Sequence, residues 1–151
     1  MKVAAVDIGT NTFLCLIAEV EGGEIRKVFE DVVEVVRIGE GVAQSRQFSS
    51  AAIARADACL SEFRHLIDGH KVAKVLAVAT SAARDVQNSE LLLALGTKHQ
   101  IPIQIISGTQ EAQLTYQGVR SNRGMGSDIV VIDVGGGSTE IIYQDGSRIS
   151  G

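Results

Sequence analysis

The sequence predicts an α/β fold in which three antiparallel strands are followed by parallel strands, with helices flanking the mixed sheet. Near the N-terminus, three apolar segments are joined by short turns that contain glycine, which is typical of antiparallel hairpins. Further along the chain, apolar runs alternate with segments of helical periodicity. This alternation is typical of parallel strands that are joined by crossover helices.

The first three strands are expected at residues 2–8, 12–20 and about 25–37. Gly9 lies in the turn between the first two strands, and Gly22 and its neighbour lie in the turn between the second and third. Because glycine adopts the backbone conformations that tight turns need, we expect an antiparallel meander.

A helix is expected over residues 50–68, where apolar residues recur at helical spacing. Ser49 or Ser50 is a suitable N-cap because a serine hydroxyl accepts a hydrogen bond from a free backbone N–H group. Gly69 provides the C-terminal stop.

The later elements follow as a strand, a helix, a strand and a helix. Residues 72–79 are apolar except for one lysine, which predicts a strand that is covered on both faces. Helices are expected over 89–99 and about 108–119, with a short strand over 101–106 between them.

The domain organisation is predicted from a polar, glycine-rich segment near the C-terminus. We expect a first domain at residues 1–122, a linker at 123–127 and the first hairpin of a second domain at 128–151. Two strands do not make a stable domain. We therefore expect a truncated chain, or a hairpin that is completed by this domain or by a second copy in a homodimer.

Composition excludes several classes of protein. Hydrophobic residues make up 45% of the 151 residues, so the chain is not disordered. The net charge of −4 argues against a nucleic-acid partner, and the absence of a long apolar run argues against a membrane partner. Cys15 and Cys59 lack metal-site spacing, and with no signal-peptide pattern they indicate a reduced, cytoplasmic protein.

The sequence repeats one pattern near its two ends: an apolar strand, an aspartate, a glycine-rich turn with small polar residues, and a second apolar strand. The first copy contains Asp7, Gly9, Thr10, Asn11 and Thr12. The second copy contains Asp133, Gly135, Gly136, Gly137, Ser138, Thr139 and Glu140. A buried carboxylate without a partner is costly, so each aspartate is expected to meet a compensating ligand.

These two loops have the chemistry of a phosphate and Mg²⁺ site. Backbone N–H groups of glycine-rich turns form concavities that bind anions. Asp7, Asp133 and Glu140 supply the oxygen ligands that Mg²⁺ prefers. The alternative is that the two copies are ordinary hairpins with glycine turns.

Glu111 is a candidate catalytic base. Ser107 and Gln110 have the spacing of a capping box, which gives those two residues a structural role and leaves Glu111 unexplained. A carboxylate in this first helical turn, close to the end of a strand, could accept a proton from an attacking water. The alternative is a carboxylate that is favoured there only by the helix dipole.

Arg37 and Arg84 both follow predicted strands. Ligands in open α/β sheets bind outside the carboxyl ends of the strands, where a guanidinium can hold phosphate oxygens. We therefore include both arginines in the expected phosphate site. The alternative for each is a solvated or ion-paired arginine.

The chain resembles the exopolyphosphatase and guanosine pentaphosphate phosphohydrolase (Ppx/GppA) family, which lies within the actin–Hsp70–sugar-kinase superfamily. The resemblance extends over essentially the whole chain. It is carried by the motifs at residues 7–12, 37–41, 79–85, 106–112 and 132–140. It implies a ribonuclease-H-like fold of the actin-like ATPase type.

The resemblance also implies an activity: hydrolysis of the terminal phosphate of inorganic polyphosphate, or of the 5′ γ-phosphate of guanosine pentaphosphate. In the family, the glutamate that corresponds to Glu111 activates water, residues matching Asp133 and Glu140 help to hold Mg²⁺, and the glycine loops and Arg84 bind phosphate. Gln110 stands where the family usually has glutamate.

Two other functions stay open. The chain could be a phosphate- or nucleotide-binding module without turnover, or an ATPase of the actin-like or sugar-kinase type. Family members carry a whole second domain, so the 151-residue chain by itself could also be inactive.

Overall fold

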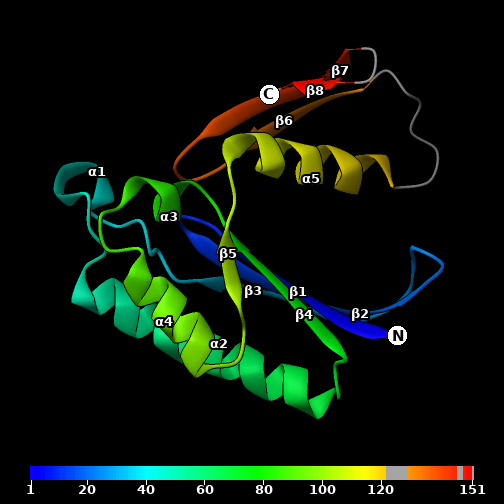
Figure 1. Ribbon diagram of the computed structural model, residues 1–151, viewed down its shortest axis with the longest axis horizontal. Helices are drawn as coiled ribbons and strands as arrows, with labels where there is room; N and C mark the ends of the chain where they lie inside the picture. Colours follow the sequence, from blue (N-terminus) through cyan, green and yellow to red (C-terminus); the bar gives the residue numbers. More distant parts are fainter. Residues whose placement is uncertain (122–128, 146–147, 151) are drawn as a thin grey trace.

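The computed structural model describes residues 1–121, 129–145 and 148–150 of the chain (Figure 1). Its main sheet has five strands in the order β3-β2-β1-β4-β5. The strands are β1 (Lys2–Ile8), β2 (Thr12–Glu21), β3 (Glu24–Val35), β4 (Lys74–Ala79) and β5 (Ile103–Ile105). β1 pairs with β2, and β2 with β3, in antiparallel fashion, whereas β1–β4 and β4–β5 are parallel. The predicted fold class is therefore confirmed.

Two helices cover one face of this sheet, α2 (Ser50–Gly69) and α4 (Glu90–Lys98) (Figure 1). Ser49 is the N-cap of α2, because its hydroxyl accepts a 3.1 Å hydrogen bond from the backbone N–H of Ala52. The largest side chains of the core come from the buried face of the sheet and from these helices. They include Phe13, Ile17, Leu60, Phe63, Ile67 and Leu92.

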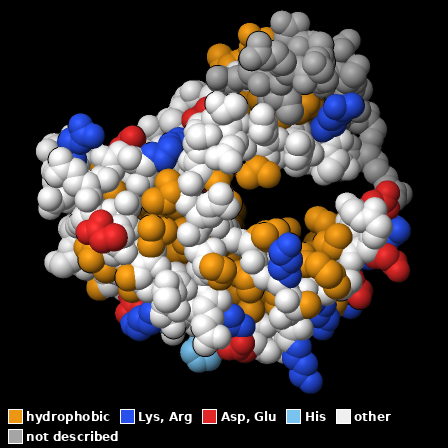
Figure 2. Space-filling model, in the orientation of Figure 1, with side chains coloured by type: hydrophobic (Ala, Val, Ile, Leu, Met, Phe, Trp, Pro, Cys, Tyr) orange, Lys and Arg blue, Asp and Glu red, His pale blue; other side chains and the backbone are white. Residues whose placement is uncertain are grey.

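The prediction that the strand ending at Ala79 is covered on both faces is wrong. Ala77 and Ala79 are buried, but Leu76 points to the opposite face and is 55% exposed. The helices α2 and α4 both lie on one side of the sheet (Figure 1), so within the described part of the chain the other face stays open along β1, β2 and β4. Figure 2 shows hydrophobic side chains at the edge of the opening on this side.

The C-terminal segment forms a second sheet of three strands, β6 (Val130–Val134), β7 (Thr139–Asp145) and β8 (Arg148–Ser150). The expectation of a two-stranded hairpin is corrected, because β8 pairs with β7 in antiparallel fashion. The expected linker at 123–127 lies outside the described residues, and the predicted domain division stays a prediction.

The helix α5 (Gly108–Arg120) packs against this second sheet. Ala112 and Tyr116 of α5 are buried against Ile142, and Ile129 and Val131 pack around them. The hairpin that seemed to lack a partner is therefore covered on one face by α5. Its other face is apolar and open. The large side chains exposed there are Val130, Ile132, Val134, Ile141 and Tyr143.

Two short helices were not predicted, α1 (Val42–Ser45) and α3 (Ser81–Asp85). Both lie near the loop between β1 and β2 (Figure 1). Each spans at most five residues. A helix of that length is too short to show the periodic spacing of apolar residues by which helices are predicted from sequence. Among the described helices, none is long and apolar enough to cross a lipid bilayer.

Candidate active site

The two repeated loops close with the same hydrogen bond. In the β1–β2 loop, the backbone N–H of Gly9 donates to the carbonyl of Thr12 at 3.0 Å. In the β6–β7 loop, the N–H of Gly135 donates to the carbonyl of Ser138 at 2.9 Å. The sequence repeat therefore corresponds to a repeat of backbone structure, with the glycine at the same position in each turn.

Glycine lets the two loops approach each other. A Cβ atom at Gly136 would overlap the side-chain amide of Asn11. A Cβ atom at Gly137 would lie 2.9 Å from the hydroxyl oxygens of Thr10 and Ser81, closer than real Cβ contacts. The close approach thus explains why the second copy has glycines in succession.

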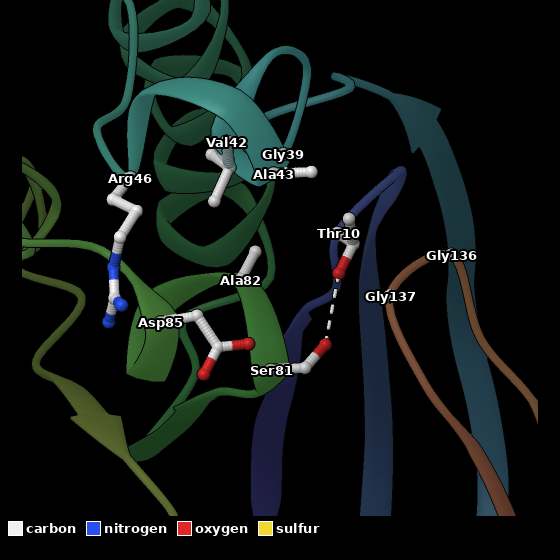
Figure 3. Close-up of a pocket in the computed structure, with 10 residues that line it drawn as sticks. All are labelled: Thr10, Gly39, Val42, Ala43, Arg46, Ser81, Ala82, Asp85, Gly136 and Gly137. Carbon is white, nitrogen blue, oxygen red and sulfur yellow. Dashed lines mark hydrogen bonds between the residues drawn. The ribbon is translucent and has the colours of Figure 1, made fainter.

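Thr10 is held in place from two sides. Its hydroxyl shares a 3.1 Å hydrogen bond with the hydroxyl of Ser81, at the start of α3 (Figure 3). Its backbone carbonyl accepts a 3.0 Å hydrogen bond from the N–H of Gly39. The first loop is therefore anchored to the ends of both β3 and β4.

A cleft of about 370 Å³ lies between the two loops. Three carboxylates reach it, from Asp7, Glu111 and Asp133. The remaining wall consists of hydroxyl and amide side chains, glycine backbone and two apolar residues. These are Gly9, Thr10, Asn11, Thr12, Leu14, Thr80, Ser81, Val134, Gly135, Gly136 and Ser138.

The cleft perturbs the acidity of Asp7. Partial withdrawal from water raises the pKa of the Asp7 carboxyl above its usual value, and the negative charges of Glu111 and Asp133 raise it further. Glu111 and Asp133 are thus close enough to Asp7 for their charges to oppose its ionisation. Such a cluster favours a bound cation, because a cation would relieve this repulsion.

Glu111 is paired with Arg84. The Nη1 atom of Arg84 lies 2.7 Å from Oε2 of Glu111, and it also donates a 2.9 Å hydrogen bond to the carbonyl of Ile106. The two side chains are 25% and 16% exposed. Among the contacts of the described residues, Glu111 Oε1 and the Nε and Nη2 atoms of Arg84 have no partner. Both groups therefore keep atoms available for a ligand or a water.

The capping box predicted for Ser107 and Gln110 is confirmed. The Ser107 hydroxyl accepts from the N–H of Gln110 at 3.2 Å, and the side-chain oxygen of Gln110 accepts from the N–H of Ser107 at 3.0 Å. This arrangement ties down the first turn of α5 just before Glu111. Glutamine makes both contacts, so the departure from the family pattern at this position leaves the cap intact.

The residues around Asp133 suit Mg²⁺ better than they suit a metal ion whose ligands all come from protein side chains. Asp133 and Glu140 are directly opposite each other on β6 and β7, and like charges in that position repel. Among the described residues, no three metal-ligating side chains come close enough to enclose an ion. Mg²⁺ is usually held by one or two carboxylates together with water and substrate phosphates, which fits this donor set.

Most of the predicted site residues are brought together in the cleft, and five are not part of its wall. Gly137 lines an adjacent cavity. Arg84 does not line the cleft itself but forms a hydrogen bond with Glu111, which does. Thr139 and Glu140 lie on β7 beside it. Arg37 is exposed, and its backbone N–H donates to the carbonyl of Asn11 at 2.8 Å.

Thr80 and Ser81 also line the cleft, although they were not among the predicted site residues. Both are nearly buried, at 8% and 7% exposure. The sequence signal that could have identified them is the pair of hydroxyl residues directly after an apolar strand. Their position at the carboxyl end of a parallel strand is where ligands bind in such sheets.

The Ppx/GppA phosphatase family matches residues 16–150 of the chain. The chain belongs to this family. It is 39% identical to exopolyphosphatase 2 of Mycobacterium tuberculosis over 95% of its own length, and the match spans 48% of that protein. The chain thus spans about half the length of the curated relatives it matches.

Solved structures agree with this membership. An exopolyphosphatase from Cytophaga hutchinsonii has a TM-score of 0.89 at 30% identity, over 99% of this chain and 48% of that one. The Ppx/GppA family member from Aquifex aeolicus has a TM-score of 0.84 at 28% identity, and the match covers 100% of this chain and 49% of that one. The ethanolamine utilization protein EutJ from Carboxydothermus hydrogenoformans, at 15% identity and a TM-score of 0.60, shares the fold.

Proposed function

We propose that this protein is a phosphoanhydride hydrolase that releases the terminal phosphate of inorganic polyphosphate. The observation that carries the proposal is the cleft in which two glycine-rich loops face each other beside Asp7, Glu111 and Asp133. The names of its relatives as exopolyphosphatases support the same reaction.

The loops would hold the phosphate chain. Their backbone N–H groups and the hydroxyls of Thr10, Thr12 and Ser138 are hydrogen-bond donors at the cleft wall. The unpaired nitrogens of Arg84 would add a positive charge close to the terminal phosphate. Mg²⁺, held by Asp133 and Glu140, would neutralise charge on the phosphate oxygens.

Glu111 would act as the general base. A water attacks the terminal phosphorus, the bridging P–O bond breaks, and the shortened polyphosphate leaves with the bond electrons. Oε1 of Glu111 takes the proton of the attacking water, while Arg84 holds Oε2 and so orients the carboxylate. Asp7 also lines the cleft and would serve as a further oxygen ligand for Mg²⁺.

Guanosine pentaphosphate is a second proposed substrate, because its 5′ γ-phosphate is joined by the same type of bond. The buried free thiols of Cys15 and Cys59 support a cytoplasmic, reducing location. Self-association into a homodimer stays a prediction. The open apolar face of β6 and β7 motivates it, and a monomeric sedimentation profile across a range of concentrations would contradict it.

The test is orthophosphate release from polyphosphate with and without Mg²⁺. We expect Glu111→Gln to lower the Mg²⁺-dependent rate by about 10²-fold or more, the usual contribution of a general base. Glu90→Gln is the matched control, because Glu90 is also an acidic residue in the first turn of a helix, α4. An unchanged rate in Glu111→Gln would remove the proposed base.

Because the chain spans about half of its relatives' length, the same two variants should also be compared in a hybrid protein. The hybrid joins the chain to the part of the Mycobacterium tuberculosis relative that the chain does not match. Polyphosphate binding without release in both forms would favour the non-catalytic binding module. Transfer of the γ-phosphate of ATP to a hydroxyl acceptor would favour the sugar-kinase type of enzyme.

A further inference from the structure

The loop that joins β3 to α1, residues 36–41, lies against the β1–β2 loop. Its first two backbone N–H groups donate to the carbonyl of Asn11 at 3.0 and 2.8 Å, and the N–H of Gly39 donates to the carbonyl of Thr10 at 3.0 Å. A Cβ atom at Gly39 would overlap the methyl group of Thr10, and Figure 3 shows these two residues close together. The 36–41 loop therefore holds two successive carbonyls of the β1–β2 loop.

These contacts set the direction of the N–H groups that follow the two carbonyls. In a planar trans peptide, the carbonyl and the next N–H point in opposite directions. Because the carbonyls of Thr10 and Asn11 both point to the 36–41 loop, the N–H groups of Asn11 and Thr12 both point away from it. Among the described residues, the Asn11 N–H has no backbone hydrogen-bond partner. Asn11 and Thr12 both line the cleft, and successive N–H groups of this kind form an anion-binding concavity.

One side chain of α2 holds the 36–41 loop in turn. Arg55 donates from Nε to the carbonyl of Val36 at 2.7 Å and from Nη2 to the carbonyl of Arg37 at 3.0 Å. The same Nη2 lies 2.8 Å from Oε2 of Glu40. Val36 and Arg37 are the two residues whose N–H groups bind the Asn11 carbonyl. The guanidinium of Arg55 is thus one residue removed from the backbone of the β1–β2 loop.

The backbone of the 36–41 loop needs this support. Arg37 has a φ of 51°, in the left-handed region, which is unfavourable for a residue with a side chain. Residues in such conformations persist only where the surrounding contacts determine them. The bond from Arg55 to the Arg37 carbonyl is a contact of this kind.

Arg55 does not reach a phosphate in the cleft directly. Within the described part of the chain, its side chain lines neither the cleft nor the adjacent cavity. Any effect of Arg55 on a ligand in the cleft must therefore pass through the 36–41 loop.

We propose that Arg55 is a positioning residue of the phosphate site: by holding the 36–41 loop, it keeps the N–H groups of Asn11 and Thr12 directed to the phosphate. This inference rests on the proposed function and deepens it. The two donors are then ordered before the ligand arrives, so binding does not carry the cost of ordering them.

The first test is Arg55→Lys, which keeps the positive charge but loses the planar fork that holds two carbonyls at once. We expect tripolyphosphate, in the presence of Mg²⁺, to bind at least about tenfold more weakly by calorimetry, since bonds from a charged donor are lost. Arg64→Lys is the matched control. Arg64 also lies on α2 and donates to a backbone carbonyl, that of Gln100, and to the carboxylate of Asp68, and none of these residues lines the cleft.

Hydrogen exchange measures the loop itself. In Arg55→Lys, the amide of Gly39 should exchange about tenfold faster than in the wild type, because its bond to the Thr10 carbonyl opens more often. The amides of β1 should keep their protection. A loss of protection in β1 of the same size would show that the substitution loosens the whole fold and would overturn the positioning role.

A double variant tests whether Arg55 acts through the 36–41 loop. Gly39→Ala forces this loop away from Thr10 and should itself weaken tripolyphosphate binding. If the two substitutions act through the same contact, their effects are not additive. We expect the double variant to bind within about twofold of Gly39→Ala alone. A further tenfold loss would show that Arg55 acts by another route and would overturn the positioning role. Circular dichroism checks that each variant folds, and Arg55→Lys alone decides the matter if Gly39→Ala does not fold.

The outcomes separate this inference from the proposed function. Equal affinity of Arg55→Lys and the wild type for tripolyphosphate, or an equal loss in Arg64→Lys, would overturn the positioning role and leave the phosphate cleft standing. Failure of the wild type to bind tripolyphosphate would overturn the phosphate cleft and the positioning role together.

Discussion

The guanidinium of Arg84 and the carboxylate of Glu111 form an ion pair at 2.7 Å that joins the end of α3 to the first turn of α5. The same Arg84 nitrogen donates to the carbonyl of Ile106, at the end of β5. One side chain thus links the five-stranded sheet to the helix that covers the second sheet. This contact gives the proposed base a defined orientation.

Removal of this link should be measurable in both stability and binding. Arg84→Gln leaves the mostly buried Glu111 carboxylate without its partner. We expect the free energy of unfolding to fall by about 1–2 kcal/mol and tripolyphosphate to bind more weakly. Urea denaturation and calorimetry are the measurements. Arg64→Gln is the control, because Arg64 is similarly exposed but pairs with Asp68 within α2. Equal binding losses in the two variants would contradict a local role for Arg84.

The close approach of the loops predicts a specific effect of Gly137→Ala. The new methyl group would lie 2.9 Å from the oxygens of Thr10 and Ser81, so the loops must separate. We expect about tenfold weaker tripolyphosphate binding with the main fold retained, as judged by circular dichroism and calorimetry. Gly69→Ala is the control, since no atom lies within 4 Å of a Cβ there. Unchanged affinity in Gly137→Ala would show that loop contact is unimportant for binding.

Gly96→Ala and Gly118→Ala should change stability in opposite directions. A Cβ at Gly96 of α4 would lie 2.7 Å from the backbone carbonyl of Ile101, which cannot move freely, so we expect a loss of about 1–3 kcal/mol. Gly118 lies inside α5 with open space around it. Alanine there should add about 0.5–1 kcal/mol, because it has less conformational freedom to lose. Denaturant unfolding measures both, and a destabilised Gly118→Ala would show that the end of α5 needs glycine.

Asp7 should make the protein less stable as the pH rises. Its pKa is raised above the ordinary value of 3.8 by partial burial and by the charges of Glu111 and Asp133. The folded state therefore binds this proton more tightly than the unfolded state, and the stabilisation is present below pH 3.8 and lost above the raised pKa. Asp7→Asn should accordingly raise the melting temperature at neutral pH. A lower melting temperature at neutral pH would contradict the repulsion of the Asp7 carboxylate by Glu111 and Asp133.

Asp57 should behave in the opposite way. Hydrogen bonds from Lys98 and His99 lower its pKa below 3.8, so its contribution to stability is present above that pH and is lost as the pH falls through the lowered pKa. Asp57→Asn should lower the melting temperature at neutral pH and have little effect in acid. A pH-independent difference from the wild type would show that these bonds, which link α2 to α4, do not depend on the charge of Asp57.

Strand order and the covered face show the limit of local prediction. The antiparallel meander and the later parallel strands follow from turn residues and apolar periodicity, which are local properties. The strand that contains Leu76 was wrongly predicted to be covered on both faces, and the error has a physical reason. A run of apolar residues indicates that both faces of a strand are apolar, but it does not indicate which other elements pack against each face. The position of α5 on the second sheet is likewise set by packing between distant segments.

The sequence alone determined the two glycine loops, the capping box at Ser107 and Gln110, and the carboxylates Asp7, Glu111 and Asp133, because spacing and residue type encode turns and caps directly. Only the tertiary structure decided that Arg84 pairs with Glu111, that Ser81 holds Thr10, and that a second cavity lies beyond them. These contacts form where separate strands end at one edge of the fold. Which side chains meet there depends on strand order and loop paths, and no local pattern in the sequence specifies those.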